Sequence, residues 1–310
     1  MGGMPGGLEG GAQPMALVGP TASGKSALAH AVALTAGDIE VVTVDSMQVY
    51  RGMKIGTAKP TPDEQAEVRY HLLDVADPAE DFSLARYLPA ARDALADIRA
   101  RGRRALLVGG TGLYVQALVD DLEVPGLFPA ARAEVEAELD TAALHARLAN
   151  LDPVAAGRME PTNRRRVVRA LEVTLGSGRP FSSFGPGLEV FPPSPVRQVG
   201  LRVPGELLDR RIEARVEAMV AAGLVAEVGA LAARPGGLSR TARQALGYRE
   251  VLAHLAGECS LDEALTLTVT RTRQLARRQV RWFRRDPRIR WFDVDANRLP
   301  DPAAVLGDWR

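Results

Sequence analysis

One loop decides the fold of this chain: Gly19-Pro20-Thr21-Ala22-Ser23-Gly24-Lys25-Ser26. It fits G-x-x-x-x-G-K-[ST], a pattern whose backbone N–H groups converge on an anion while the following helix adds partial positive charge. The residues on either side fit a strand–loop–helix arrangement, because Met15–Val18 is typical of a short buried strand and Ala27–Leu34 of a helix. We expect Lys25 to supply a full charge and the Ser26 hydroxyl to bind Mg²⁺. The loop therefore predicts a site for a phosphate or diphosphate.

Composition narrows the class of protein. The chain has 310 residues, of which 46% are hydrophobic, so one large domain or two modules are expected. A single cysteine, Cys259, excludes an internal disulfide and predicts a cytoplasmic protein. We expect no membrane span, since no apolar run approaches the roughly 18 residues that one requires. Residues 1–13 are rich in glycine, lack the features of a signal peptide and are expected to be disordered.

Positive charge is concentrated although the formal net charge is only +1. Nine arginines and one aspartate lie between Arg271 and Arg290. A second cluster consists of Arg158, Arg164, Arg165, Arg166 and Arg169. Such patches indicate a polyanionic partner, although charge alone leaves open two solvated helix faces.

The first part of the chain alternates strand and helix. Ile39–Val44 and Ala105–Val108 are expected strands, Ala90–Ala100 is an expected helix, and another helix begins near Leu113. Continuous apolar strands in such an alternation indicate a parallel α/β sheet. The fold class predicted is α/β, with a P-loop NTPase-like core.

Beyond Asp120 the pattern becomes helical. One helix is expected over Ala130–Leu148, a second over Pro161–Leu175, then a loop and a returning strand over Val196–Val203. We therefore predict a small helical insertion domain at 123–195 within a core made of 14–122 and 196–310. The C-terminal region should be helical, over 206–222, 225–233 and 261–285.

Ligands of parallel sheets bind beyond the carboxyl ends of the strands. Asp45 directly follows a strand there and could bind Mg²⁺ through water, act as a general base, or cap the next segment. Thr111 lies in Gly109-Gly110-Thr111-Gly112, where it could instead cap a helix. The glycines could admit a ligand or simply form a turn.

Two arginines on the helix expected over 206–222 could reach the ligand crevice beyond the carboxyl ends of the strands. Arg211 and Arg215 flank an apolar helical stripe, so they could reach a diphosphate or extend into solvent. The four histidines show no metal-ligand spacing, and we interpret them as structural or exposed.

Several motifs together resemble the tRNA dimethylallyltransferases, the IPP transferase family, over about residues 14–290. The selective stretches are Gly19–Ser26, Asp45–Met53, Ile55–Pro60, Tyr70–Asp74, Val108–Tyr114, Arg166–Val173, Gln244–Glu250 and Thr272–Gln279. Two positions depart from the common pattern: Ser26 replaces a frequent threonine but keeps the hydroxyl, and Lys54 replaces a frequent aspartate.

The resemblance implies transfer of a dimethylallyl group from dimethylallyl diphosphate to N6 of adenosine 37 in the tRNA anticodon loop. Asp45 would be the general base, Thr111 would lie near the reacting base, and Lys25, Thr21 and Arg215 would bind the diphosphate, with Ser26 as the Mg²⁺ ligand. The phosphate loop would then hold a leaving diphosphate instead of a nucleotide, and a monomer is expected.

The resemblance also implies three segments that contact tRNA. They are Asp45-Ser46-Met47-Gln48, Arg165-Arg166-Val167-Val168-Arg169 and Gln244-Ala245-Leu246-Gly247-Tyr248-Arg249. The insertion domain would contact the anticodon loop. Two alternatives remain: an ATP-dependent P-loop kinase of a small metabolite, with the insertion as a lid, and an RNA-binding module switched by a nucleotide.

Overall fold

The computed structural model describes residues 13–295 and 298–309. The expected disordered tail, 1–13, lies outside the described residues except for Gln13. The chain divides into two compact units, one formed by residues up to Val119 together with those from Pro193 onward, the other by Asp120–Pro192. The second unit begins and ends three residues before the predicted insertion.

The first unit is built on a six-stranded parallel sheet, which confirms the predicted α/β class. Its strands lie in the order β3-β2-β4-β1-β5-β6. They are β1 (Met15–Val18), β2 (Ile39–Val44), β3 (Tyr70–His71), β4 (Arg104–Gly109), β5 (Arg197–Arg202) and β6 (Ile289–Asp293). Sequence analysis did not predict β3 and β6, the two edge strands.

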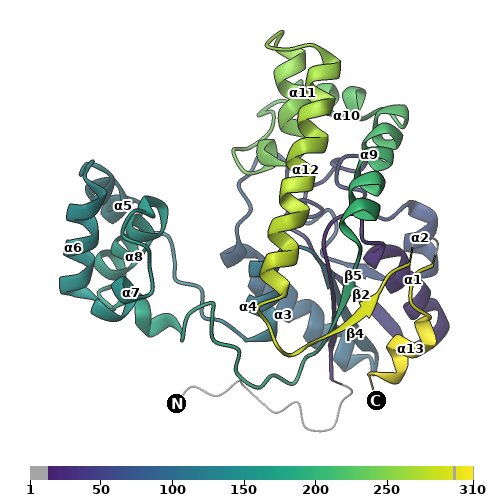
Figure 1. Ribbon diagram of the computed structural model, residues 1–310, viewed down its shortest axis with the longest axis horizontal. Coiled ribbons are helices and arrows are strands. Elements are labelled where there is room, and N and C mark those ends of the chain that lie inside the picture. The colour runs from purple at the N-terminus through teal and green to yellow at the C-terminus, as the bar shows by residue number, and fades with distance from the viewer. Residues whose placement is uncertain (1–12, 296–297, 310) are drawn as a thin grey trace. The chain divides into compact units, whose positions relative to one another are not determined.

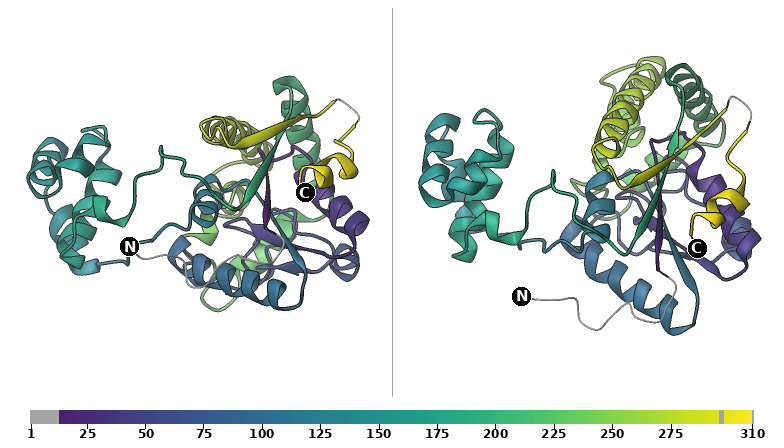
Figure 2. Two further views of the ribbon diagram at one scale, coloured as in Figure 1. Left: turned by 90° about the horizontal axis from the view of Figure 1, so that it is seen from below. Right: turned by 60° about the horizontal axis from the view of Figure 1, so that its bottom comes forward.

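Helices cover both faces of the sheet, so its central strands are apolar on both sides. Alternate residues Met15 and Leu17 of β1 pack in one core cluster with Leu28 and Val32 of α1 (Lys25–Ala36). The same cluster contains Val305 of α13 (Pro302–Gly307), which lies beside α1 (Figure 2). The opposite face is covered by α3 (Leu84–Ala100) and α4 (Gly112–Val119).

A helical layer lies beyond the carboxyl ends of the strands. Its two longest members, α9 (Gly205–Ala221) and α12 (Leu261–Phe283), run side by side (Figure 1). Ile212 of α9 and Ala276 of α12 share a small core. The remaining helices of this unit are α2 (Pro62–Glu67), α10 (Leu224–Ala232), α11 (Tyr248–Leu255) and the 3-10 turn η2 (Ala242–Gln244).

The second unit is a helical bundle with its own core. Its helices are α5 (Pro129–Glu136), α6 (Thr141–Leu151), α7 (Pro153–Gly157), α8 (Arg164–Ser177) and the 3-10 turn η1 (Phe181–Phe184). Leu144, Leu148 and Leu171 are at most 1% exposed in that core. The predicted single helix over 130–148 is wrong, because Asp140 accepts a hydrogen bond from Ala142 N at 2.8 Å and so starts a new helix.

Candidate active site

The carboxyl ends of three neighbouring strands coincide in register. Val18 of β1 pairs with Gly109 of β4, and Gly109 pairs with Val44 of β2. The loops that follow these strands therefore leave the sheet together. With residues of α9 and α12 and the segment 244–249, they line a cavity of about 980 Å³ within the first unit. None of the helices described in the structure is long and apolar enough to cross a bilayer.

The backbone of the phosphate loop enters the left-handed region at two positions. Ala22 and Gly24 adopt positive φ angles of 60° and 90°, and α1 begins at Lys25. Thr21, Ala22, Gly24, Lys25 and Ser26 line the cavity. Gly19, Pro20 and Ser23 are buried behind them and shape the loop. The loop leads into the N-terminus of α1, where backbone N–H groups and the helix dipole favour an anion.

Three cationic side chains line the cavity near the phosphate loop: Lys25, Arg211 and Arg215. Burial and the neighbouring Arg215 lower the pKa of Lys25 to about 8, and Asp45 opposes that shift. Burial also lowers the pKa of Arg215, again against Asp45. Lys25 Nζ donates to Pro20 O at 3.2 Å, and no described residue forms an ion pair with Arg215. The buried positive charge is thus available for an anionic ligand.

Asp45 both caps a turn and faces the cavity. Its Oδ1 accepts hydrogen bonds from Met47 N at 2.8 Å and Gln48 N at 3.3 Å. The Thr111 hydroxyl accepts from Ser46 N at 3.3 Å, so Thr111 is joined to the Asp45 loop by its side chain. Oδ1 is therefore held by the turn, and no described residue donates a hydrogen bond to Oδ2.

The glycines after β4 are explained by packing. A side chain at Gly109 would collide with the Val44 carbonyl, and one at Gly112 with the Trp282 ring. At Gly110 a Cβ would come within 2.6 Å of Gln279 Nε2. The backbone of β2 thus leaves no space for a side chain at Gly109, and the Trp282 ring leaves none at Gly112, whereas at Gly110 the nearest atom is the end of the Gln279 side chain.

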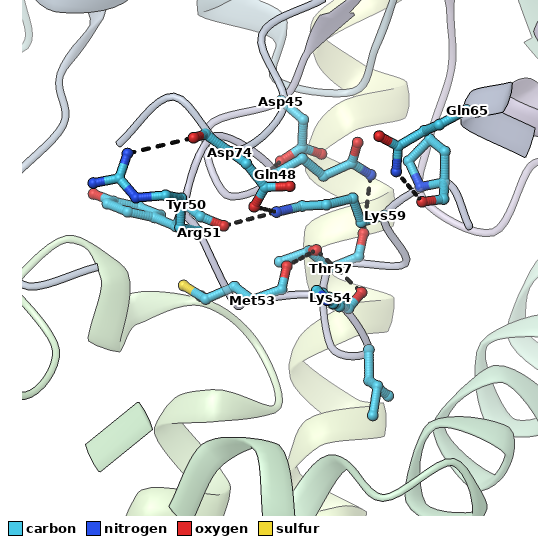
Figure 3. A network of polar contacts seen from close by, with 12 residues as sticks. Asp45, Gln48, Tyr50, Arg51, Met53, Lys54, Thr57, Lys59, Gln65 and Asp74 are labelled. Atoms are coloured by element: carbon cyan, nitrogen blue, oxygen red, sulfur yellow. Dashed lines mark hydrogen bonds and ion pairs between the residues drawn. The ribbon is translucent and has the colours of Figure 1, made fainter. Parts of the chain in front are cut away.

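The segment 47–60 forms one rim of the cavity, and buried polar contacts hold it (Figure 3). Gln48 Nε2 donates to the carbonyls of Thr57 at 3.0 Å and Ala58 at 3.2 Å. Lys59 Nζ donates to Tyr50 O at 2.7 Å and pairs with Asp74 at 2.6 Å. Burial lowers the pKa of Lys59, and Asp74 opposes the shift. The rim is therefore fixed by its own side chains.

Glu227 of α10 clamps the same rim from outside. Its carboxylate accepts from the backbone N–H groups of Lys54 at 3.1 Å and Ile55 at 2.9 Å, and at a longer 3.4 Å from Gly56. The Tyr248 hydroxyl donates to the same carboxylate. Lys54 thus contributes through its backbone; nothing in the structure explains the choice of lysine there.

The residues of the predicted tRNA-contacting segments differ in whether they line the cavity. Ser46, Met47, Gln48, Gln244, Ala245, Leu246 and Arg249 line the cavity together with Asp45. Tyr248 does not, because its side chain is fully buried and its hydroxyl donates to Glu227. Gly247 is also buried, and its N–H donates to Glu250 at 2.9 Å.

The segment 165–169 belongs to the second unit. Arg165 and Arg166 are exposed on the first turn of α8. Val167 and Val168 are buried in that unit's core, so only their backbone is left for the contact with RNA that this segment is predicted to make. Arg169 pairs with Glu172 at 2.6 Å and donates to Pro125 O, which gives it a structural role.

Helix α12 supplies cavity residues that sequence analysis did not place at the site. Arg271, Leu275, Arg278 and Trp282 line the cavity at spacings of four, three and four, which form one helical stripe. Gln279, also on the wall, accepts from Thr21 N and donates to Gly110 O, both at 2.8 Å. The helical spacing of these residues is evident from the sequence, whereas the hydrogen-bond partners of Gln279 are known only from the structure.

The residues present suit a magnesium ion bound chiefly by its ligand. The Ser26 hydroxyl and the Asp45 carboxylate share the cavity wall, and the described residues contain no cluster of three or more His, Cys, Asp or Glu side chains. Mg²⁺ typically keeps several waters and binds one or two protein groups together with phosphate oxygens.

Two family models match the chain: IPP transferase over residues 48–286 and isopentenyl transferase over 13–77. The tRNA dimethylallyltransferase of Kineococcus radiotolerans is 54% identical over 286 residues, covering 90% of each chain. That of Streptomyces coelicolor is 50% identical, covering 94% of this chain and 95% of the relative.

Solved structures agree with these matches. The tRNA isopentenylpyrophosphate transferase of Bacillus halodurans aligns with a TM-score of 0.68 at 37% identity, covering 96% of this chain and 97% of that one. A eukaryotic dimethylallyltransferase acting on tRNA aligns with a TM-score of 0.78 at 25% identity, covering 95% and 77%. The chain belongs to the IPP transferase family.

Proposed function

We propose that this protein transfers the dimethylallyl group of dimethylallyl diphosphate to N6 of adenosine 37 in a tRNA anticodon loop and releases diphosphate. The observation that carries the proposal is one cavity that holds the cations Lys25 and Arg215 beside the acidic Asp45. The relatives are named for transfer to tRNA, which supports this reaction and not the metabolite kinase.

The cationic end of the cavity suits the leaving group. Lys25, Arg215 and Arg211 would bind the diphosphate, together with the backbone N–H groups at the start of α1. As the C1–O bond breaks, its electron pair passes to the diphosphate, whose added charge these groups stabilise. The apolar residues Ile212, Val216 and Met219 of α9 line the same cavity and would contact the allyl chain.

The acidic side suits the acceptor. Adenine N6 is a weak nucleophile, because its lone pair is delocalised, so the reaction needs both positioning and proton removal. The N6 lone pair forms the new bond to C1, and the N6 proton passes to the free oxygen of Asp45. Thr111, joined to Ser46, would position the base. The base must leave its stack to reach this cavity.

Magnesium is part of the proposal. Ser26, with Asp45 through water, would hold the ion next to the diphosphate. When bound, it would neutralise part of the charge on the leaving diphosphate.

Exposed arginines are proposed to bind the phosphates of the anticodon stem-loop. Arg278 and Arg281 of α12 and Arg284 at its C-terminal cap are exposed and have no ion-pair partner among the described residues. Other members of this run serve the fold, as Arg271 does with Glu250 and Arg273 with Glu213. The charge run is thus partly structural. We also propose that the protein acts as a monomer in the cytoplasm.

The decisive experiment is to incubate the protein with Mg²⁺, dimethylallyl diphosphate and an anticodon stem-loop, and to weigh the RNA. A gain of one C5 unit is expected. ATP turnover without a change in RNA mass would instead indicate the kinase. RNA binding without either reaction would indicate the RNA-binding module.

Asp45→Ala should lower turnover by about 10²–10⁴-fold, because the general base is lost, while RNA affinity stays nearly unchanged. Asp93→Asn, on the exposed face of α3, is the control and should behave as the parent protein. Equal loss of turnover and RNA affinity in Asp45→Ala would contradict the role of Asp45.

A further inference from the structure

Gln279 connects two loops that the proposed reaction must keep in register. Its Oε1 accepts from Thr21 N of the phosphate loop at 2.8 Å, and its Nε2 donates to Gly110 O of the loop after β4 at 2.8 Å. Both ends of one neutral amide are therefore satisfied by the backbone. These contacts span 258 and 169 positions of the chain.

The surrounding residues are shaped to this amide. A Cβ at Gly110 would lie 2.6 Å from Gln279 Nε2, so the glycine makes room for it. One turn along α12, Trp282 fills the space at Gly112 in the same way. Gln279 is half-buried and lines the cavity, so it lies at the edge of the site itself.

The two loops belong to different halves of the reaction. Thr21 belongs to the loop that would hold the diphosphate. Gly110 precedes Thr111, whose hydroxyl accepts from Ser46 N beside Asp45, on the side of the acceptor base. Hydrogen bonds thus lead from the phosphate loop through Gln279 to the loop that carries Thr111.

We propose that Gln279 is a positioning residue that sets the spacing between the diphosphate loop and the acceptor loop. The identity of the two ligands rests on the proposed function. A misplacement of about 1 Å between reacting groups can lower a rate by about 10²-fold, whereas binding of each ligand depends on its own loop. Losing the amide should therefore reduce kcat more than the affinity for either ligand.

The test uses Gln279→Met, which keeps the length and volume of the side chain but removes both hydrogen bonds. Gln279→Glu keeps an acceptor for Thr21 N and places a carboxylate oxygen against the Gly110 carbonyl. The control is Gln198→Met on β5, because buried Gln198 donates to Asp286 at 3.1 Å, in contacts that do not include the cavity.

Three quantities are measured on the full chain: kcat and KM in the C5-transfer assay, the affinity for Mg²⁺-pyrophosphate, and amide hydrogen exchange by mass spectrometry. We expect kcat of Gln279→Met to fall about 10–100-fold with the KM for RNA changed less than threefold. Exchange should rise in peptides covering 19–24 and 109–112. Gln279→Glu should show the same pattern, and Gln198→Met should lose stability alone.

An unchanged kcat in a folded Gln279→Met variant would overturn the proposal, whether or not loop exchange rises. Unchanged exchange in 109–112 would overturn it as well. Failure of the proposed function is separable, because it would appear as no C5 transfer by the parent protein. Loop exchange and pyrophosphate affinity would then still decide whether Gln279 orders the two loops.

Discussion

At the residue scale, Lys25 gives the site a pH dependence. Its pKa of about 8 in the ligand-free protein means that its positive charge is lost as pH rises through 8. A bound diphosphate favours the charged form, so binding above pH 8 should take up a proton and weaken with rising pH.

Calorimetric titration with Mg²⁺-pyrophosphate at pH 7 and pH 9, in buffers of different ionisation enthalpy, measures this uptake. We expect an affinity roughly 10-fold lower at pH 9, from the share of Lys25 then neutral. Lys25→Arg keeps its charge and should bind with little pH dependence in this range. The same proton uptake in Lys25→Arg would assign the effect to another group.

Arg215 should matter for one ligand only. Because it is buried among groups that would bind diphosphate, Arg215→Ala should weaken pyrophosphate binding by about 10–100-fold, the value of a charge-assisted contact, and leave RNA affinity nearly intact. Arg210→Ala, exposed on the same helix, is the matched control. Equal losses for both ligands in Arg215→Ala would contradict the assignment.

Individual site residues were predictable from sequence where a strand end exposes them. Asp45 and Thr111 follow buried strands directly, so their shared rim could be inferred from parallel topology. Gln279 could not, since its partners lie far away in sequence. Nor could the place of Tyr248, whose polar side chain lies in the core and supports Glu227 although its motif is predicted to contact tRNA.

At the scale of elements, the 47–60 rim depends on α10 through Glu227, which contacts it at residues 54–56. Glu227→Gln replaces one acceptor oxygen by an NH₂ group. It therefore leaves the backbone N–H of Lys54 or of Gly56 without its acceptor, whereas Ile55 N–H contacts both oxygens and keeps one. We expect a loss of about 1–3 kcal/mol in the free energy of unfolding, measured by urea denaturation.

The same variant should raise KM for both substrates, because the rim lines the cavity. The control is Glu217→Gln, an exposed position on α9 with no ion pair among the described residues. Stability of Glu227→Gln within experimental error of the parent protein would show that the clamp is unimportant.

Central elements were predicted well, and peripheral ones were not. The strands observed at 15–18, 39–44 and 104–109 match the largely apolar runs that a buried parallel sheet imposes, whereas β5, Arg-Gln-Val-Gly-Leu-Arg, has arginines at both ends. The edge strands β3 and β6 carry no such run: β3 has two residues, and β6 follows the arginine-rich helix. Composition alone suggested one helix over 130–148, but Asp140 caps the start of a new helix within that segment.

At the scale of the whole molecule, the sequence predicted two units, and the structure gives each its own core. The charge clusters were harder to interpret, because ion pairs within each unit use many of the arginines. Arg164, for example, donates to the carbonyls of Leu139 and Glu138. Only the structure separates these from the exposed arginines proposed to bind RNA.

That separation gives a prediction for the helical unit. Arg165 and Arg166 are exposed on α8, and if each contacts a phosphate, the double variant Arg165→Ala/Arg166→Ala should reduce the slope of log Kd against log salt by about 1.4–1.8. RNA affinity at low salt should fall, while kcat at saturating RNA should stay unchanged, because these residues lie outside the unit that carries the cavity. Arg147→Ala is the control, since Arg147 pairs with Glu134 at 2.7 Å on the same unit. A slope equal to that of the parent protein would remove the helical unit from the RNA-binding surface and leave the arginines of α12 as its basic part.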